Sequence, residues 1–239
     1  MPGGKRAGLI GKIEVNFILK NTLLTVSYFV TGFLFLLCKN NVSFIPSFTL
    51  KALLIPWLIV IFLLNIKLLQ DKLNLLFLTG LIFCWAGDIL LEVPLHYADL
   101  FVPGLGCFLT GHLMYLLVFS LTPGDNFVFR KGSVFIIPVI LYGILLVLWL
   151  YKDLGNMKIP VIAYATVILT MLAAAINRKN KVNHASFLMV LSGAILFVLS
   201  DSALAINKFG HNFSGSSVIV MVTYILAQYF IVTGYLKQK

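Results

Sequence analysis

Eight long stretches of nearly uninterrupted apolar residues alternate with short polar segments along the chain. A helix needs about 20 residues to cross the roughly 30 Å hydrocarbon layer of a bilayer, and each stretch is about that long. The pattern therefore predicts one transmembrane helical domain covering 1–239, an all-α polytopic membrane bundle, with residues 1–17 as a lead-in before the first span. The eight predicted spans are 18–38, 46–65, 73–91, 101–121, 134–151, 159–176, 185–205 and 216–236.

Composition agrees with this pattern. The chain of 239 residues is 60% hydrophobic and 11% charged, with a mean hydropathy of +1.01, whereas about a quarter of the residues in a soluble domain are charged. The net charge of +10 does not indicate a nucleic-acid partner, because the basic residues are spread over many short loops. The lead-in is basic but lacks the apolar core and cleavage site of a removable signal peptide.

The basic residues predict the orientation, because Lys and Arg are enriched in cytoplasmic loops. With the N-terminus inside, thirteen of them fall on the cytoplasmic side, four on the other side, and Lys51 lies within a span. Both termini are therefore predicted to be cytoplasmic, in a bacterial inner membrane or a eukaryotic endomembrane. The cytoplasmic set is Lys5, Arg6, Lys12, Lys20, Lys67, Lys72, Arg130, Lys131, Arg178, Lys179, Lys181, Lys237 and Lys239, and the opposite set is Lys39, Lys152, Lys158 and Lys208.

Polar side chains from several spans fall in the non-cytoplasmic half of the predicted membrane layer. Ionisable groups inside a bundle usually face a cavity and pair with one another. Each also has an ordinary structural explanation: Asp201 bonded to backbone donors near the interface, Lys51 extending to the head groups, or Glu92 in water at the rim. The candidate site residues are Lys51, Asp88, Glu92, His112, Tyr115, Tyr164, Asp201, Asn207, Tyr224 and Gln228.

A weak internal similarity relates the two halves of the chain. A shift of about 113 residues places Asp88 on Asp201 and Lys51 on Tyr164. Because four helices separate the halves, these could be two parallel four-helix repeats, related by a pseudo-twofold axis along the membrane normal. Such an axis could bring the two aspartates together.

These same stretches resemble the lysoplasmalogenase-like (YhhN) family of integral membrane proteins. The matching segments are "LKALLIP", "CWAGDILL", "FLTGHLMY", "IAYATVI", "GAILFVLSDSALAINKF" and "MVTYILAQYFIVTG", which together span about residues 50–236. One departure is Ala52, where the family pattern has a proline directly after the lysine. Here the proline is Pro56, which would crowd the carbonyl of Ala52 and kink the helix.

The resemblance implies hydrolysis of the vinyl-ether bond of lysoplasmalogens, giving a fatty aldehyde and glycerophosphoethanolamine or glycerophosphocholine. That reaction needs a neutral acid to protonate the alkene, a carboxylate to stabilise the oxocarbenium ion, and a base for water. Two carboxyls in a site of low dielectric share these tasks well, because both cannot easily ionise. We expect Asp88 and Asp201 to form this pair, and the sequence does not indicate which is the acid. Lys51 would bind the phosphate or bias which aspartate stays protonated, and the other candidates would orient water and the head group.

No cofactor is expected, and the partners are the lysoplasmalogen and the lipid bilayer. A zinc site is not indicated, because His96, His184 and His211 fall in loops and only His112 is in a span. The main alternative is a small ion- or proton-coupled transporter that uses the same Asp and Lys cluster. A lipid-binding scaffold without catalysis is a third interpretation.

Overall fold

The computed structural model describes residues 3–41, 44–93, 99–125, 133–210 and 213–238, and every regular element in these ranges is helical. Seven helices are long and apolar enough to cross a membrane, and the eighth, over Val134–Leu150, is a shorter apolar helix. The all-α polytopic membrane fold is thus confirmed. The helices are α1 Gly3–Asn41, α2 Phe44–Asn65, α3 Lys72–Glu92, α4 Phe101–Leu121, α5 Ser133–Leu150, α6 Lys158–Ile176, α7 His184–Phe209 and α8 Ser216–Leu236.

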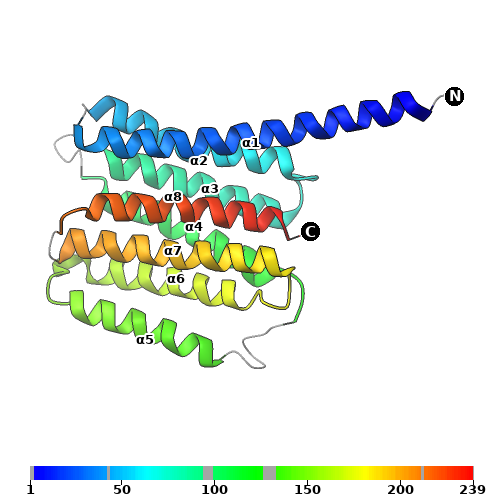
Figure 1. Cartoon of the computed structure of the whole chain (residues 1–239). Coiled ribbons are helices and arrows are strands. Elements are labelled where there is room, and N and C mark those ends of the chain that lie inside the picture. Colours follow the sequence, from blue (N-terminus) through cyan, green and yellow to red (C-terminus); the bar gives the residue numbers. More distant parts are fainter. Residues whose placement is uncertain (1–2, 42–43, 94–98, 126–132, 211–212, 239) are drawn as a thin grey trace.

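The helix ends follow local signals in the sequence. Asp71 caps α3 by accepting from the backbone N–H of Leu73, and Asn183 caps α7 by accepting from Ser186, as N-cap residues do. α1 begins at Gly3, so the predicted lead-in is a helical extension of the first span, and it projects beyond the other helices (Figure 1).

After the helical lead-in of α1, the largest departure from the predicted spans is at the end of α7. This helix continues past residue 205 to Phe209, with Gly210 as its C-cap. Two polar contacts account for the extra turn: Asn207 accepts a hydrogen bond from the Ser216 hydroxyl at 2.7 Å, and the Lys208 ammonium lies 4.8 Å from the centre of the Phe101 ring. Asn207 is therefore a helical residue that faces the start of α8.

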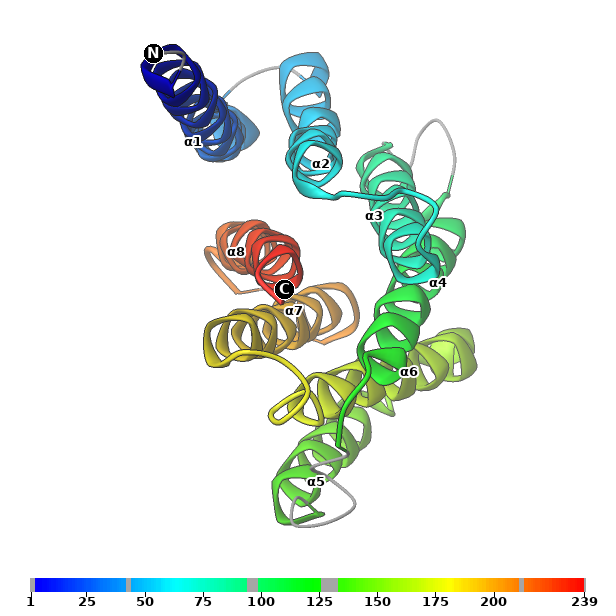
Figure 2. The ribbon, with the colours of Figure 1, turned by 90° about the vertical axis from the view of Figure 1, so that its right-hand side faces the viewer.

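The helices form an arc around a central pair (Figure 2). Seen along the bundle, α1, α2, α3, α4, α6 and α5 follow one another around α7 and α8, which pack against each other. α2 contacts α8 while α4 contacts α6, and these two contacts are counterparts under the 113-residue shift. Both chain ends lie at the same end of the bundle (Figure 1), which an even number of spans requires.

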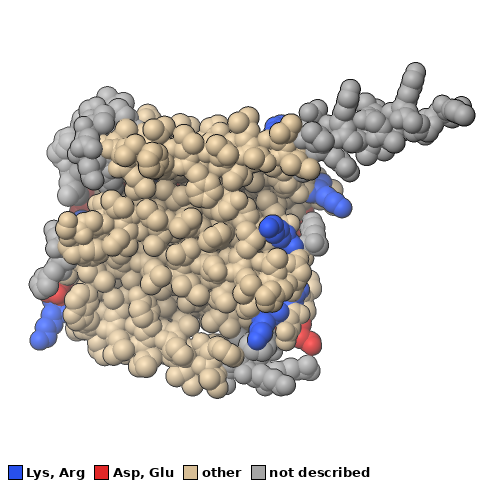
Figure 3. Space-filling view, viewed as in Figure 1, with Lys and Arg blue, Asp and Glu red and all other residues tan. Residues whose placement is uncertain are grey.

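The flank of the bundle is apolar and the charges lie at its ends (Figure 3). Large hydrophobic side chains such as Leu23, Ile137 and Leu148 are exposed on the outside, as expected for a surface that faces lipid. Which end faces the cytoplasm remains the prediction made from the basic residues. Residues Arg130, Lys131 and Lys239 of that prediction lie outside the described ranges.

Glycines allow close contact between α3 and α4 and between α7 and α8. A Cβ added to Gly80 of α3 would lie 2.9 Å from the Tyr115 ring of α4, and one added to Gly193 of α7 would lie 2.8 Å from the Ala227 carbonyl oxygen of α8. Small residues at such crossings allow transmembrane helices to pack tightly. Gly80 and Gly193 are also counterparts under the 113-residue shift, so the two pairs are built alike.

Candidate active site

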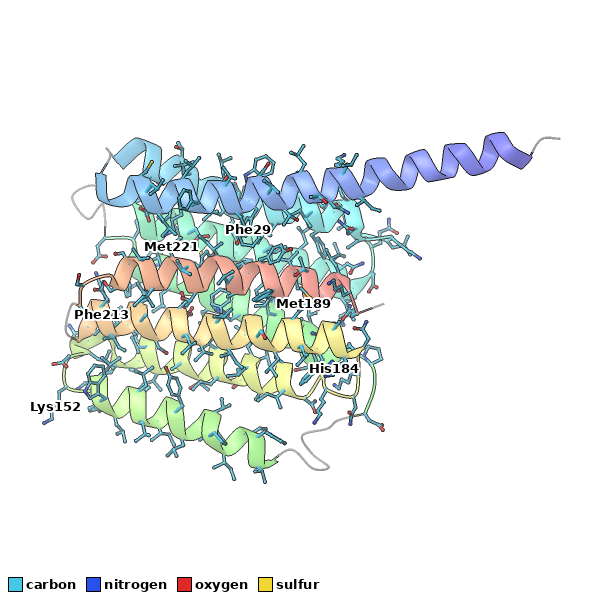
Figure 4. All side chains as sticks on the ribbon, viewed as in Figure 1. Phe29, Lys152, His184, Met189, Phe213 and Met221 are labelled. Atoms are coloured by element: carbon cyan, nitrogen blue, oxygen red, sulfur yellow. The ribbon has the colours of Figure 1, made fainter. Side chains whose placement is uncertain are left out.

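A cavity of about 220 Å³ lies at the end of the bundle opposite the chain termini. In Figure 4 this is the end marked by Lys152 and Phe213, and Met221 is one of the lining residues. α3 and α7 end here, and α4, α6 and α8 begin here. The polar lining residues are Lys51, Asp88, Glu92, Tyr164, Ser200, Asp201, Asn207, Ser217 and Tyr224.

The first carboxylate of the cavity, Asp88, is nearly inaccessible, with 2% of its surface exposed. Its Oδ2 accepts a hydrogen bond from the Tyr224 hydroxyl at 2.5 Å. Its Oδ1 lies 4.0 Å from the Lys51 ammonium. Both oxygens of Asp88 therefore face donors, as a buried carboxylate requires.

The second carboxylate, Asp201, has a different environment. Its Oδ2 accepts from the Tyr164 hydroxyl at 2.5 Å, and the same hydroxyl lies 3.4 Å from Nδ1 of His112. The ammonium that approaches Asp88 is replaced here by a phenol. The two aspartates of the cavity thus differ in charge environment although each is held by one tyrosine.

Lys51 is already paired. Its ammonium lies 2.9 Å from Glu92 Oε2, closer than it lies to Asp88. The sequence prediction treated Lys51 as a cation available to a phosphate and Glu92 as a rim group, whereas the structure joins them in one ion pair on the cavity wall. Any anion that binds Lys51 must compete with Glu92.

A hydrogen bond from Trp85 to the backbone of Ala52 fixes the helix turn that carries Lys51. Pro56 has no N–H, so the Ala52 carbonyl four residues earlier lacks its helical donor. The indole N–H of Trp85, one turn before Asp88 in α3, donates to this carbonyl at 2.8 Å. The proline kink in α2 is therefore bound to the helix that carries Asp88, and this bond fixes Lys51 relative to that aspartate.

Three predicted site residues lie behind the cavity and do not line it. The Tyr115 hydroxyl donates to Gln228 Oε1 at 3.0 Å, and Gln228 Nε2 in turn lies 3.4 Å from the Tyr224 hydroxyl. His112 is fully buried beside Phe197, and its Nε2 has no hydrogen-bond partner among the described residues. Depth along a span was predicted from the sequence, but direct contact with a substrate does not follow from depth.

The contacts repeat under the internal shift. Lys51 approaches Asp88 as Tyr164 approaches Asp201, and the shift carries the first pair onto the second. Tyr115 and Gln228 are counterparts of each other, and they share a hydrogen bond. Counterparts can touch only near the axis that relates them, so this bond accords with a pseudo-twofold axis that passes between α4 and α8.

Several lining residues were not anticipated from the sequence. The Ser200 hydroxyl donates to the Val220 carbonyl at 2.9 Å. In the sequence, only its position next to Asp201 could have indicated that Ser200 lines the cavity. The apolar part of the wall carried no signal, because its residues look like any lipid-facing or core position. This apolar part comprises Leu91, Phe101, Leu105, Phe108, Val161, Leu204, Ala205, Phe209, Val220 and Met221.

The described residues contain no group of three or more His, Cys, Asp or Glu side chains that could hold a metal ion. The chemistry available in the cavity is therefore that of two carboxyls, two phenols and one ammonium–carboxylate pair. Such a set can donate and accept protons and can stabilise a cation.

An apolar bundle of spanning helices around a cavity lined by two tyrosine-bonded aspartates defines a polytopic membrane protein with paired carboxyls between its helices. The YhhN family model matches residues 47–235, which include both aspartates and all the other candidate site residues. The chain belongs to the YhhN family.

Curated relatives match the same region. The chain is 30% identical over 161 residues to lysoplasmalogenase TMEM86B of Homo sapiens, covering 67% of this chain and 63% of the relative. It is 33% identical over 155 residues to lysoplasmalogenase TMEM86B of Sus scrofa, covering 64% and 61%. It is 27% identical over 161 residues to a lysoplasmalogenase of Mycobacterium bovis, covering 65% and 58%. The match thus spans less than two thirds of each relative, and no solved structure matches the chain.

Proposed function

We propose that this protein is a membrane hydrolase that cleaves the vinyl-ether bond of lysoplasmalogens. The products are a fatty aldehyde and glycerophosphoethanolamine or glycerophosphocholine. The observation that carries the proposal is the cavity with two tyrosine-bonded aspartates in different charge environments. Support also comes from relatives whose names state this activity.

The charge environments divide the roles of the two aspartates. Asp88 has donors at both oxygens, including the Lys51 ammonium at 4.0 Å, and an opposite charge favours the ionised carboxylate. Asp201 has only the Tyr164 phenol among its described donors, so its other oxygen is the place for a proton. Asp201 is then the general acid and Asp88 the stabilising carboxylate and base.

The reaction follows from these roles. Asp201 protonates the alkene carbon farther from the ether oxygen, and the positive charge that forms on the O–C unit is stabilised by the Asp88 carboxylate, as in glycosidases. Water adds to the cationic carbon and gives its proton to Asp88. The resulting hemiacetal then collapses: its hydroxyl gives its proton to the Asp201 carboxylate as the aldehyde carbonyl forms, and the glycerol oxygen leaves with the proton that Asp88 took from water. One water molecule is consumed and both carboxyls can return to their starting states.

The Lys51–Glu92 ion pair suits a zwitterionic head group. A phosphate that replaces Glu92 beside Lys51 frees the glutamate for the ammonium of ethanolamine or choline. The exchange keeps two opposite charges paired on the cavity wall, so it leaves no charge buried alone. Lysophospholipids with an anionic head group would leave Glu92 without a partner of this kind.

Behind the cavity, the remaining residues position the two tyrosines. Gln228 bonds to both Tyr115 and Tyr224, and His112 lies against the Tyr164 hydroxyl. These contacts fix the orientation of each phenol and through it the orientation of each carboxyl. His112, Tyr115 and Gln228 therefore act as positioning residues. This role takes the place of the direct contact with substrate that we expected from the sequence.

The test is aldehyde release by the purified full chain. The protein in lipid nanodiscs is incubated with lysoplasmenylethanolamine, and the aldehyde is trapped as a hydrazone and quantified. Two control substrates are the saturated alkyl-ether analogue, which has no alkene to protonate, and the two-chain plasmalogen, whose second chain must also fit the cavity. Release from the lysoplasmalogen alone is expected. No release from protein of native helix content would reject the hydrolase and leave the transporter as the leading reading.

A further inference from the structure

A second, larger hollow lies on the lipid-facing side of α5 and α6. It has a volume of about 500 Å³ and is almost wholly apolar. Because its α5 wall includes the exposed residues Ile140, Ile144 and Leu148, it is a groove at the surface of the bundle. The lining residues are Ile136, Val139, Ile140, Gly143, Ile144, Val147, Leu148, Ile162, Ala165, Thr166, Leu169, Thr170 and Ala173.

A narrow space of about 50 Å³ between α5, α6 and α7 lies between this groove and the candidate active site and shares wall residues with both. On one side it shares Tyr164 and Asp201 with the site cavity. On the other it shares Gly143 and Ala165 with the groove. Consecutive residues of α6 therefore line different spaces: Tyr164, which bonds to Asp201, lines the site cavity, and Ala165 lines the groove.

Two contacts keep α5 close to this connection. The Tyr142 hydroxyl donates to the Ser202 hydroxyl of α7 at 2.7 Å, and both residues border the narrow space. A Cβ added to Gly143 would lie 2.1 Å from Leu169 Cδ1 of α6. The glycine thus allows α5 to approach α6 where the groove begins, and the phenol ties the same turn of α5 to the helix that carries Asp201.

We propose that the groove between α5 and α6 binds the hydrocarbon chain of a single-chain ether lipid while its reacting bond lies at Tyr164 and Asp201. The inference rests on the proposed function and adds to it the place of the chain. The head group occupies the polar cavity, and the chain passes through the narrow space and lies along α6 in contact with the bilayer.

The length of the groove fits one chain. From Ile162 to Ala173 the groove follows twelve residues of α6, and the eleven steps between the first and the last cover about 17 Å at a rise of 1.5 Å per residue. One leaflet of a bilayer has a hydrocarbon depth of about 15 Å, half of the full layer. The groove therefore matches a fatty chain of ordinary length and runs in the direction in which the chains of the leaflet run.

The groove is expected to select chains by shape and not by strength of binding. Lipid tails are as apolar as the groove, so transfer from the bilayer gives little hydrophobic free energy. The groove instead sets the position of the lipid along α6, because a chain bound in it holds the adjacent vinyl ether at the carboxyl pair. Shortening the groove should therefore affect long chains and spare short ones.

The test shortens the groove with Thr170→Phe. Thr170 lies two turns beyond Ile162, away from the site cavity, and its hydroxyl bonds only to the Thr166 carbonyl of its own helix in the described contacts. The matched control is Thr79→Phe in α3, where the hydroxyl also bonds to the carbonyl four residues earlier and which lines none of the three spaces.

Turnover is measured on two lysoplasmalogens, one whose alkenyl chain ends before Thr170 and one whose chain passes it. For Thr170→Phe we expect turnover of the long chain to fall about tenfold, because the ring blocks the path of the chain and displaces the vinyl ether from the carboxyl pair. Turnover of the short chain should stay within about twofold. Thr79→Phe should leave the ratio of the two unchanged. An unchanged ratio in well-folded Thr170→Phe would overturn the proposal.

A second measurement tests whether a lipid chain occupies the groove and does not depend on catalysis. A saturated alkyl-ether lysophospholipid with a diazirine at the end of its chain is photolysed with the protein in nanodiscs, and the adducts are mapped by mass spectrometry. Adducts concentrated on 133–150 and 158–176 are expected. Adducts spread evenly over the outer faces of all the helices, as bulk lipid would give, would overturn the groove. If the protein released no aldehyde but labelled this groove, the hydrolase would fail and the chain site would stand.

Discussion

The contact between Trp85 and the Ala52 carbonyl allows one prediction to be worked out in full. Trp85→Phe removes the indole N–H that donates to this carbonyl at 2.8 Å and keeps an aromatic ring in the same place. Because Pro56 cannot supply a backbone donor, the carbonyl is then left without one. A buried carbonyl without a partner costs about 1–3 kcal/mol in proteins, and hydrogen bonds within membrane bundles average near the lower end of that range.

We therefore expect Trp85→Phe to lower the free energy of unfolding by about 1–2 kcal/mol. Pro56→Ala restores the N–H that can reach Ala52 within the helix. In that background the hydrogen-bond part of the cost should vanish, and only the loss of ring size remains. The two substitutions should thus show a coupling of about 1 kcal/mol, which is measurable because independent sites add to within about 0.5 kcal/mol.

The assay is reversible unfolding in mixed micelles of increasing SDS fraction, followed by far-ultraviolet circular dichroism so that the loss of a tryptophan does not affect the signal. The matched control is Trp57→Phe in α2, the helix that contains Ala52 and Pro56; its indole donates to the Thr31 hydroxyl at 3.2 Å. A hydroxyl that loses this donor still donates to the Ser27 carbonyl, so the cost should be smaller. If Trp85→Phe cost the same with Pro56 and with Ala at 56, the explanation of the kink would be refuted.

Three further predictions concern the site and the topology. Asp88→Asn and Asp201→Asn should each lower aldehyde release by about 10²-fold or more, as expected for the loss of a general acid or base. The double variant should lose little more activity than either single variant, and monodispersity in detergent checks that each protein is folded. Turnover of Asp201→Asn within a few-fold of wild type would mean that this aspartate takes no part in catalysis. Treatment with a strong chelator should leave aldehyde release unchanged, because the described residues offer no ligand set; a loss that zinc alone restores would contradict this. Tags at the two termini should be accessible from the same, cytoplasmic, side in protease-protection assays, and termini on opposite sides would mean an odd number of spans and undo the orientation.

Much of the fold could be predicted because span length and hydropathy are local properties. Six of the eight predicted spans agree with the helices to within two residues at each end. The first differs because α1 includes the lead-in and ends three residues later, at Asn41. The end of α7 depends on contacts that no local pattern contains: Asn207 with Ser216, and Lys208 over Phe101. A helix end stabilised from a neighbouring helix is not visible in its own sequence.

The candidate site could be predicted as a set of residues but not as a geometry. Depth along each span correctly grouped Lys51, Asp88 and Asp201, because rise per residue is constant. Which side chains reach the cavity was not predictable. Tyr224 and Gln228 lie one turn apart on the same face of α8, yet Tyr224 lines the cavity and Gln228 lies behind it. The pairing of Lys51 with Glu92 also depends on how α2 meets α3, which the kink at Pro56 and the Trp85 contact decide.

The position of the cavity at one end of the bundle, with the groove leading away from it along the outside, has a consequence for the direction of the proposed reaction. Cleavage divides an amphiphile into a water-soluble glycerophosphodiester and an oil-soluble aldehyde. In the proposed reaction the first product would leave at the polar end beside Lys51 and Glu92, and the second would move along α5 and α6 into the leaflet. The products would then enter different phases, and this partitioning would drive turnover forward without any source of energy beyond hydrolysis itself.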